Sequence, residues 1–213
     1  MKIGIIGSGN IGGNLGKHWA RAGHYVIFSS RHPEELKNLV IEAGENAKAL
    51  SVQHTFEANA DVYLLAVPFK AIDKIAELYA DEYATKVIID ATNPYPERDG
   101  EIALKVRSAN YNASEYTAMK FATAKTAKAF NTIHAEHLRD RAFRDVDKLT
   151  VPYAAQDEES KAVVRQLIQD IGFDSLYIGN LSDTRIMDPN QVIYGKSLQC
   201  NALKELVDAT KSY

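Results

Sequence analysis

The stretch KIGIIGSGNIGGNLGKHWARAG, residues 2–23, decides the fold of this chain. Its first part, residues 2–7, is a short run rich in β-branched residues and predicts a buried strand. Its second part, residues 12–23, has the spacing of an amphipathic helix that ends at Gly23. A buried strand that passes through glycines directly into a helix is the opening unit of an α/β dinucleotide-binding fold.

The loop between this strand and this helix has the spacing Gly-x-Gly-x-x-Gly. Gly7 permits a tight turn, Gly9 lets the backbone approach a pyrophosphate, and Gly12 allows close packing of helix on strand. Unpaired N–H groups and the positive end of the helix dipole attract phosphate at such a terminus. A glycine-rich turn that only packs a helix is the alternative. The predicted phosphate cradle consists of Gly7, Ser8, Gly9, Asn10, Ile11 and Gly12.

Strand-like and helix-like runs alternate along the rest of the chain, apart from the less periodic segment 94–118, for which we expect a surface loop with a short helix. The alternation predicts a Rossmann-type, doubly wound α/β fold, with a mostly parallel sheet, helices on both faces and a C-terminal helix. We expect one domain over residues 1–213, in which residues 180–213 close the cleft or form a dimer interface. The predicted strands are 24–30, 49–54, 61–68, 86–95, 126–133, 148–155 and 174–179, and the predicted helices are 33–44, 69–83, 158–172 and 189–211.

The composition is that of an ordinary globular protein, with 46% hydrophobic and 25% charged residues among 213 and a net charge of −3. This balance gives no basis for a nucleic-acid or anionic-membrane partner. No apolar run reaches the roughly 18 residues of a membrane span, and the N-terminus lacks the apolar region of a signal peptide. Cys200 is the single cysteine, which excludes an intramolecular disulfide and a cysteine-cluster metal site. We therefore expect a cytoplasmic protein.

The second predicted strand ends in Ser29, Ser30, Arg31 and His32, where NAD-binding folds place a carboxylate. Ser30 follows Gly9 by 21 positions, close to the spacing of roughly 20 at which that carboxylate contacts the adenosine ribose. A carboxylate would repel a 2′-phosphate, whereas the Ser30 hydroxyl can bond it and Arg31 offers a charged fork for its oxygens. Ser29 and His32 add further donors. The alternative is a merely polar strand end, but together with the glycine loop the pattern predicts NADP(H) rather than NAD.

Short polar or proline-containing segments follow three other predicted strands. In a doubly wound sheet the ligand lies across the carboxyl ends of the strands. We therefore expect these segments to surround the nicotinamide half of the cofactor, although each also has an ordinary interpretation as a strand end or a turn. The residues are Ala66, Val67 and Pro68, then Thr92 and Asn93, and then Asn131 and Thr132.

Several segments together resemble a known family. MKIGIIGSGNIGG, GHYVIFSSRHPEEL, DVYLLAVPFKAI, VIIDATNPY, KAFNTIHAEHL and GNLSDTRIMDP are similar, in this order from Met1 to about Tyr194, to NADP oxidoreductases of the coenzyme F-420-dependent type. A similar domain occurs in ferric reductases that pass electrons from NADPH through a flavin. The resemblance implies hydride transfer between NADP(H) and a second flat redox cofactor, the deazaflavin F-420 or a flavin, and a homodimer. Archaeal members tend to have His-Thr-Ile where this chain has Asn-Thr-Ile from Asn131, which leaves the acceptor open.

Hydride transfer between two rings requires little more than holding them face to face and excluding water. We accordingly predict no catalytic side chain and no metal, because His134 and His137 lack a third ligand. A reductase of a small carbonyl or imine substrate would need a proton donor, for which Lys128, His134 or a tyrosine are the candidates. Related imine reductases add a large helical domain, whereas about 34 residues follow Gly179 here. A non-catalytic NADPH-binding sensor is a further alternative.

Overall fold

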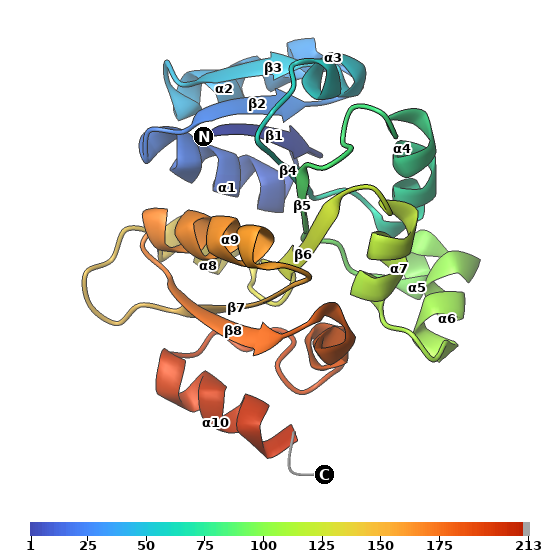
Figure 1. The fold of residues 1–213 in the computed structure, drawn as a ribbon. Helices are drawn as coiled ribbons and strands as arrows, with labels where there is room; N and C mark the ends of the chain where they lie inside the picture. The colour runs from blue at the N-terminus through green and yellow to red at the C-terminus, as the bar shows by residue number, and fades with distance from the viewer. Residues whose placement is uncertain (211–213) are drawn as a thin grey trace.

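A computed structural model of the protein describes residues 1–210 and contains one eight-stranded sheet within that range (Figure 1). The strands are β1 (Lys2–Ile6), β2 (Tyr25–Ser29), β3 (Ala47–Leu50), β4 (Val62–Leu65), β5 (Val87–Asp90), β6 (Lys125–Ala129), β7 (Thr150–Ala155) and β8 (Asp174–Gly179). Their order is β3-β2-β1-β4-β5-β6-β7-β8. Strands β1 to β6 are parallel, β7 is antiparallel to β6, and β8 is parallel to β7. The predicted mostly parallel sheet is confirmed.

Helices cover both faces of the sheet, as predicted (Figure 1). The helices are α1 (Asn10–Arg21), α2 (Lys37–Ala43), α3 (Val52–Glu57), α4 (Ile72–Leu78), α5 (Pro96–Asp99), α6 (Glu101–Ser108), α7 (Ala113–Lys120), α8 (Ala135–Asp140), α9 (Glu158–Asp170) and α10 (Cys200–Thr210), with 3₁₀ turns η1 (Pro33–Leu36), η2 (Phe69–Ala71) and η3 (Leu181–Met187). Apolar residues of α1, α8 and α9 belong to one buried cluster, and those of α3, α4, α6 and α7 belong to a second. None of these helices is long and apolar enough to cross a membrane.

The central strand β1 is buried on both faces because its side chains alternate between the two clusters. Ile3 and Ile5 pack with α1 and α9, whereas Ile6 packs on the opposite face. Gly4, which lies between Ile3 and Ile5 in the sequence, leaves room for the ring of Tyr63. A Cβ at Gly4 would lie 2.5 Å from Tyr63 Cδ1. The continuous apolar run at the start of the chain therefore reflects burial from two sides.

Two predictions about the first half of the chain need correction. The predicted strand 49–54 stops at Leu50, because the Ser51 hydroxyl accepts a hydrogen bond from the His54 N–H and starts helix α3. The segment 94–118 is not a loop with one short helix, since it contains α5, α6 and the start of α7. Asn112 and Glu115 form a capping box at the start of α7. The starts of α3 and α7 are therefore set by polar residues that cap the helix, and not by the regular spacing of apolar residues.

The predicted terminal helix 189–211 was also wrong in its first half. Residues 188–199, which we call the C-terminal strap, are not helical, and α10 begins only at Cys200. Asn190 and Gly195 have φ angles of +70° and +69°, and this left-handed backbone cannot continue a right-handed helix. Residue 211 of the prediction lies outside the described residues. The strap instead crosses from η3 to α10, which packs on β8.

Several predicted strands run past their true ends. The predictions 61–68, 86–95 and 126–133 correspond to strands that stop at Leu65, Asp90 and Ala129. The residues beyond these ends form loops at the carboxyl edge of the sheet, and the candidate functional site is built from those loops.

Candidate functional site

A cavity of about 350 Å³ lies at the carboxyl ends of β1, β4, β5 and β6. The neighbours of β1 are β2 on one side and β4 on the other, so the order of the strands reverses here. Doubly wound sheets bind ligands at this kind of reversal. The predicted residues that line the cavity are Asn10, Ile11, Ala66, Val67, Pro68, Thr92, Asn93 and Asn131.

The glycine loop shapes the entrance to helix α1. Gly7 has a φ angle of +102°, and a Cβ at Gly12 would lie 2.1 Å from the Gly7 carbonyl oxygen, so both positions require glycine for the fold. Gly9 differs from them, because a Cβ there would meet no described atom within 4 Å. Packing inside the protein therefore does not require glycine at position 9. The loop therefore leaves open space directly in front of the helix.

The start of α1 fits the pyrophosphate of a dinucleotide. Gly9 is the N-cap residue, and it has no side chain that could accept from the N–H groups of the first turn. The Ser8 hydroxyl donates to the Ser29 carbonyl oxygen at 3.0 Å and ties the loop to the end of β2. Donors without a side-chain cap, next to the open space at Gly9, are the features of an anion site at the start of this 12-residue helix.

The predicted phosphate residues at the end of β2 do not all face solvent. Arg31 is exposed, and its guanidinium makes no hydrogen bond or ion pair with any residue in the range 1–210. The Ser30 hydroxyl accepts from the His32 N–H at 3.0 Å, and the His32 ring lies 3.4 Å from the Glu34 carboxylate. Ser29 is buried, so its hydroxyl cannot reach a bound phosphate without rearrangement. Ser30 and Arg31 are the residues best placed for a 2′-phosphate.

Two asparagines at the other end of the site bond to each other. Asn131 Nδ2 donates to Asn93 Oδ1 at 3.0 Å, and Asn93 Nδ2 donates to the Asn131 carbonyl oxygen at 2.9 Å. Among the described residues, Asn131 Oδ1 is buried without a hydrogen-bond partner. A buried, unpaired acceptor on a residue of the cavity wall suits an N–H donor of a ligand, such as a carboxamide. Thr132, by contrast, is buried outside the cavity wall.

The cavity wall also contains residues that the sequence did not indicate as site residues, namely Ala91, Tyr95, Arg98, Phe130, Ile133, Ala135 and Tyr194. The hydroxyls of Tyr95 and Tyr194 are in contact, although the two residues lie 99 positions apart. The Arg98 guanidinium carbon lies 4.9 Å from the centre of the Tyr95 ring. Asn-Pro before Tyr95 indicated a turn, but no local signal pointed to Tyr194 as its partner.

The structure separates the residues that we considered as metal ligands or proton donors. His134 lines the cavity, whereas His137 bonds to the Ser197 hydroxyl at 2.6 Å. Within residues 1–210, no three His, Cys, Asp or Glu side chains are grouped as metal ligands. Lys128 is fully buried and does not line the cavity. It is therefore not placed to protonate a ligand.

Comparison with known proteins finds a matching family model and related reductases. The model of the family "NADP oxidoreductase coenzyme F420-dependent" matches residues 2–94. The F420-dependent NADP reductase of Methanothermobacter thermautotrophicus is 30% identical over 200 residues, which cover 88% of this chain and 85% of the relative. Metalloreductase STEAP3 of Rattus norvegicus is 28% identical over 184 residues, which cover 86% of this chain. The match spans only 35% of that reductase.

Solved structures share the fold. The hypothetical protein SMa0349 of Sinorhizobium meliloti superposes with a TM-score of 0.81 at 24% identity, covering 94% of this chain and 96% of that chain. An imine reductase of Aspergillus terreus, solved with NADPH4 and an azepine, superposes with a TM-score of 0.65 at 14% identity. It covers 99% of this chain and 62% of that chain.

Proposed function

This chain belongs to the family of coenzyme F420-dependent NADP oxidoreductases, and on that premise we propose that it transfers hydride between NADP(H) and a second flat redox cofactor. The second cofactor is the deazaflavin F420 or a flavin. The observation that carries the proposal is the continuous edge formed by the open space at Gly9 and the cavity beside it. Asn10 and Ile11 follow Gly9 directly and line that cavity, so one extended ligand can span both.

The dinucleotide would lie along this edge in one orientation. Its pyrophosphate occupies the loop Gly7–Gly12, and its 2′-phosphate takes Ser30 and Arg31 as ligands, with His32 nearby. Its nicotinamide enters the cavity next to the loop 66–68, and its carboxamide donates to Asn131 Oδ1. The exposed, unpaired guanidinium of Arg31 supports NADP(H) over NAD.

When bound, NADPH supplies the hydride, and the protein holds the two rings together and keeps water out. Ile11, Val67 and Ile133 contribute apolar side chains to the cavity wall. Asn93 and Asn131 form two hydrogen bonds with each other. These bonds hold the loops after β5 and β6 together in the cavity wall. No side chain needs to act as an acid or a base, since the transferred species moves between two cofactors.

The experiment is NADPH oxidation by the purified protein, followed by absorbance, with oxidised coenzyme F420 as acceptor and FMN or riboflavin for comparison. Turnover with F420 supports the deazaflavin as partner, and turnover with flavin alone moves the protein to the flavin-dependent reductases. Binding of NADPH without oxidation by any of these acceptors would contradict the proposal. A reductase of small carbonyl or imine substrates, or an NADPH sensor, would then take its place.

We further propose that the chain forms a single NADP-binding domain and acts as a cytoplasmic homodimer, with residues 180–210 closing the cleft or forming the dimer interface. Support for closure comes from Tyr194 of the strap, which lines the cavity. Helix α10 is held on its own subunit by Leu203 and Val207, which are buried against β8 and η3. Sedimentation equilibrium at several protein concentrations tests the dimer, and a monomer at all of them would contradict it.

A further inference from the structure

Two tyrosine hydroxyls from distant parts of the chain meet at the cavity wall. Tyr95 follows β5, and Tyr194 belongs to the C-terminal strap. Their hydroxyls are in hydrogen-bonding contact, and both residues line the cavity. Burial, and next the hydrogen bond with Tyr95, raise the pKa of Tyr194, so its hydroxyl is protonated at neutral pH. One proton of the pair makes the contact between the two oxygens, and the other can be donated to a ligand.

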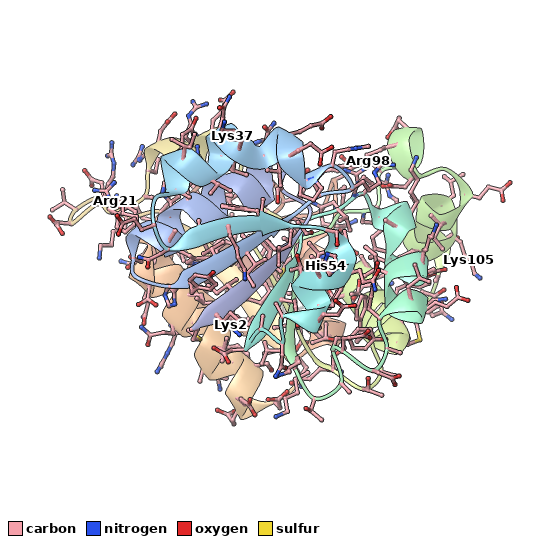
Figure 2. All side chains as sticks on the ribbon, turned by 90° about the horizontal axis from the view of Figure 1, so that it is seen from above. Lys2, Arg21, Lys37, His54, Arg98 and Lys105 are labelled. Carbon is pink, nitrogen blue, oxygen red and sulfur yellow. The ribbon has the colours of Figure 1, made fainter. Side chains whose placement is uncertain are left out.

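Arg98 is held beside this pair. Its Nη2 donates to the Asn93 carbonyl oxygen at 2.7 Å and to Asp99 Oδ2 at 2.8 Å, and its guanidinium lies over the Tyr95 ring. The Asp99 side chain is fully buried and does not line the cavity, whereas 41% of the Arg98 side chain is exposed. In Figure 2, Arg98 lies well away from Lys2, the first residue of β1. Asn93 and Asp99 therefore hold the guanidinium in place, and Arg98 is part of the cavity wall.

Arg98 and the Tyr95–Tyr194 pair bring hydrogen-bond donors to this end of the cavity, whose wall also contains His134. The Arg98 guanidinium can only donate hydrogen bonds, and within residues 1–210 its Nη1 has no partner. The Tyr95–Tyr194 pair presents its second hydroxyl proton. The Asn93 carbonyl oxygen, which would accept a hydrogen bond, already receives one from Arg98. A ligand that fits this end brings a hydrogen-bond acceptor, preferably one with negative charge.

We propose that Arg98 and the Tyr95–Tyr194 pair bind the carbonyl edge of the second substrate and stabilise the charge that reduction creates there. In the reaction the acceptor ring takes a hydride from NADPH, which forms a C–H bond in a deazaflavin or an N–H bond in a flavin, and NADPH becomes NADP⁺. The displaced π electrons collect on the conjugated carbonyl edge, which later takes a proton from water. Fixed donors aimed at such developing charge lower the barrier because they need not reorganise. This inference rests on the proposed function and names the class of acceptor.

The acceptor class is a flat heterocycle with a conjugated carbonyl, as in deazaflavins and flavins, and not a protonated imine. A protonated imine is a cation whose N–H needs an acceptor, and reduction removes its charge instead of creating a negative one. The donors at this end of the cavity therefore disfavour it. This chain shares its fold with imine reductases, but we do not expect it to share their substrates.

Two variants test the inference. Tyr194→Phe removes one hydroxyl and keeps the ring, and Arg98→Gln removes the charge. We expect kcat/KM for oxidised F420 or FMN to fall about tenfold for the first and about 10²-fold for the second, the two ends of the range for a lost hydrogen bond to a charged group. For Tyr194→Phe the Kd of NADPH, measured by fluorescence titration, should stay within about twofold of wild type, because Tyr194 bonds to Tyr95 and not to the residues proposed for the phosphates or the carboxamide. Arg98 also anchors the loop at Asn93, so Tyr194→Phe serves if Arg98→Gln folds poorly.

Matched controls exist elsewhere on the protein. Arg139 pairs with the next residue, Asp140, as Arg98 does with Asp99, but on the surface and outside the cavity wall. Tyr177 on β8 is a partly exposed tyrosine far from the carboxyl edge of β5 in the order of the sheet. Arg139→Gln and Tyr177→Phe should leave kcat/KM for the acceptor within about twofold of wild type.

The outcomes separate this inference from the proposed function. If the wild type oxidises NADPH with F420 or FMN and both variants match it within about twofold, the donor site is wrong while the proposed function stands. Reduction of a cyclic imine such as dihydroisoquinoline as efficiently as of F420 or FMN would also overturn the acceptor class. If the wild type is inactive with both cofactors, the proposed function fails. Binding of F420 or FMN to the NADP⁺ complex then tests the donor site separately. Weaker binding to the Arg98→Gln variant supports the site, whereas unchanged binding, or no binding to the wild type, overturns it.

Discussion

Lys128 and Asp90 form an ion pair with 3.0 Å between Nζ and Oδ2, in which neither side chain has any exposed surface. The two residues are register partners on the neighbouring strands β6 and β5. The ammonium also donates to the Thr92 carbonyl oxygen at 2.6 Å, and Asp90 Oδ1 accepts from the Thr92 N–H and hydroxyl. Thr117 donates to the other carboxylate oxygen. The pair therefore fixes the loop that leads to Asn93 in the cavity wall.

The buried pair predicts a large cost for removing one partner. Lys128→Met should lower the free energy of unfolding by about 3–5 kcal/mol, because it leaves the Asp90 carboxylate buried without its cation. Urea denaturation followed by circular dichroism measures this loss. The double variant Asp90→Asn, Lys128→Met should regain part of it, since neither charge of the pair remains. A loss below about 1 kcal/mol for Lys128→Met would show that the pair is not held as described.

The three glycines of the loop should respond differently to alanine. Gly9→Ala should leave the unfolding temperature nearly unchanged, because its Cβ meets open space, but weaken NADPH binding at least about tenfold by occupying the phosphate cradle. Gly12→Ala should destabilise the free protein by about 1–3 kcal/mol, because its Cβ lies 2.1 Å from the Gly7 carbonyl oxygen. Thermal unfolding with and without NADPH checks both. Unchanged NADPH affinity in Gly9→Ala would contradict the assignment of the cradle.

Arg31 should distinguish NADPH from NADH. Arg31→Gln should raise the Kd of NADPH by about 10- to 100-fold, the range expected for a lost hydrogen bond to a charged group, and leave the Kd of NADH unchanged. Fluorescence titration with the two dinucleotides measures this. Lys105→Gln, on the exposed surface of α6, is the control for loss of one positive charge (Figure 2). Equal weakening of both dinucleotides would mean that Arg31 does not contact the 2′-phosphate.

His18 predicts how stability depends on pH. Its Nε2 lies 2.9 Å from the Leu138 carbonyl oxygen and joins α1 to α8, and burial lowers the pKa of His18 below 6.5. As the pH falls below about 6.5, the unfolded chain takes up the proton before the folded chain does. The contribution of His18 is therefore complete above this pH and is lost as the pH falls toward its lower folded pKa. Urea denaturation near pH 7.5 and pH 5.5 should show the loss, and His18→Gln should reduce it. An NMR titration that places the pKa of His18 above 6.5 would contradict the sign.

Residue type alone predicted those parts of the site that depend on local backbone geometry. Gly7 has a positive φ angle and Gly12 has no room for a Cβ, so the turn requires glycine wherever the rest of the chain lies. Alternation of short apolar strands with helices likewise predicted the α/β sheet. The loops after β4, β5 and β6 were expected at the cleft because parallel strands end at the same edge.

Tertiary structure alone decided which distant side chains meet. Tyr95 and Tyr194 are 99 positions apart, and their contact depends on the path of a strap that the apolar spacing had suggested was helical. Lys128 looked like a candidate proton donor until the register of β5 and β6 placed it against Asp90. A local sequence carries the conformational preferences of its own backbone, whereas the pairing of side chains across the fold is set by packing and strand register.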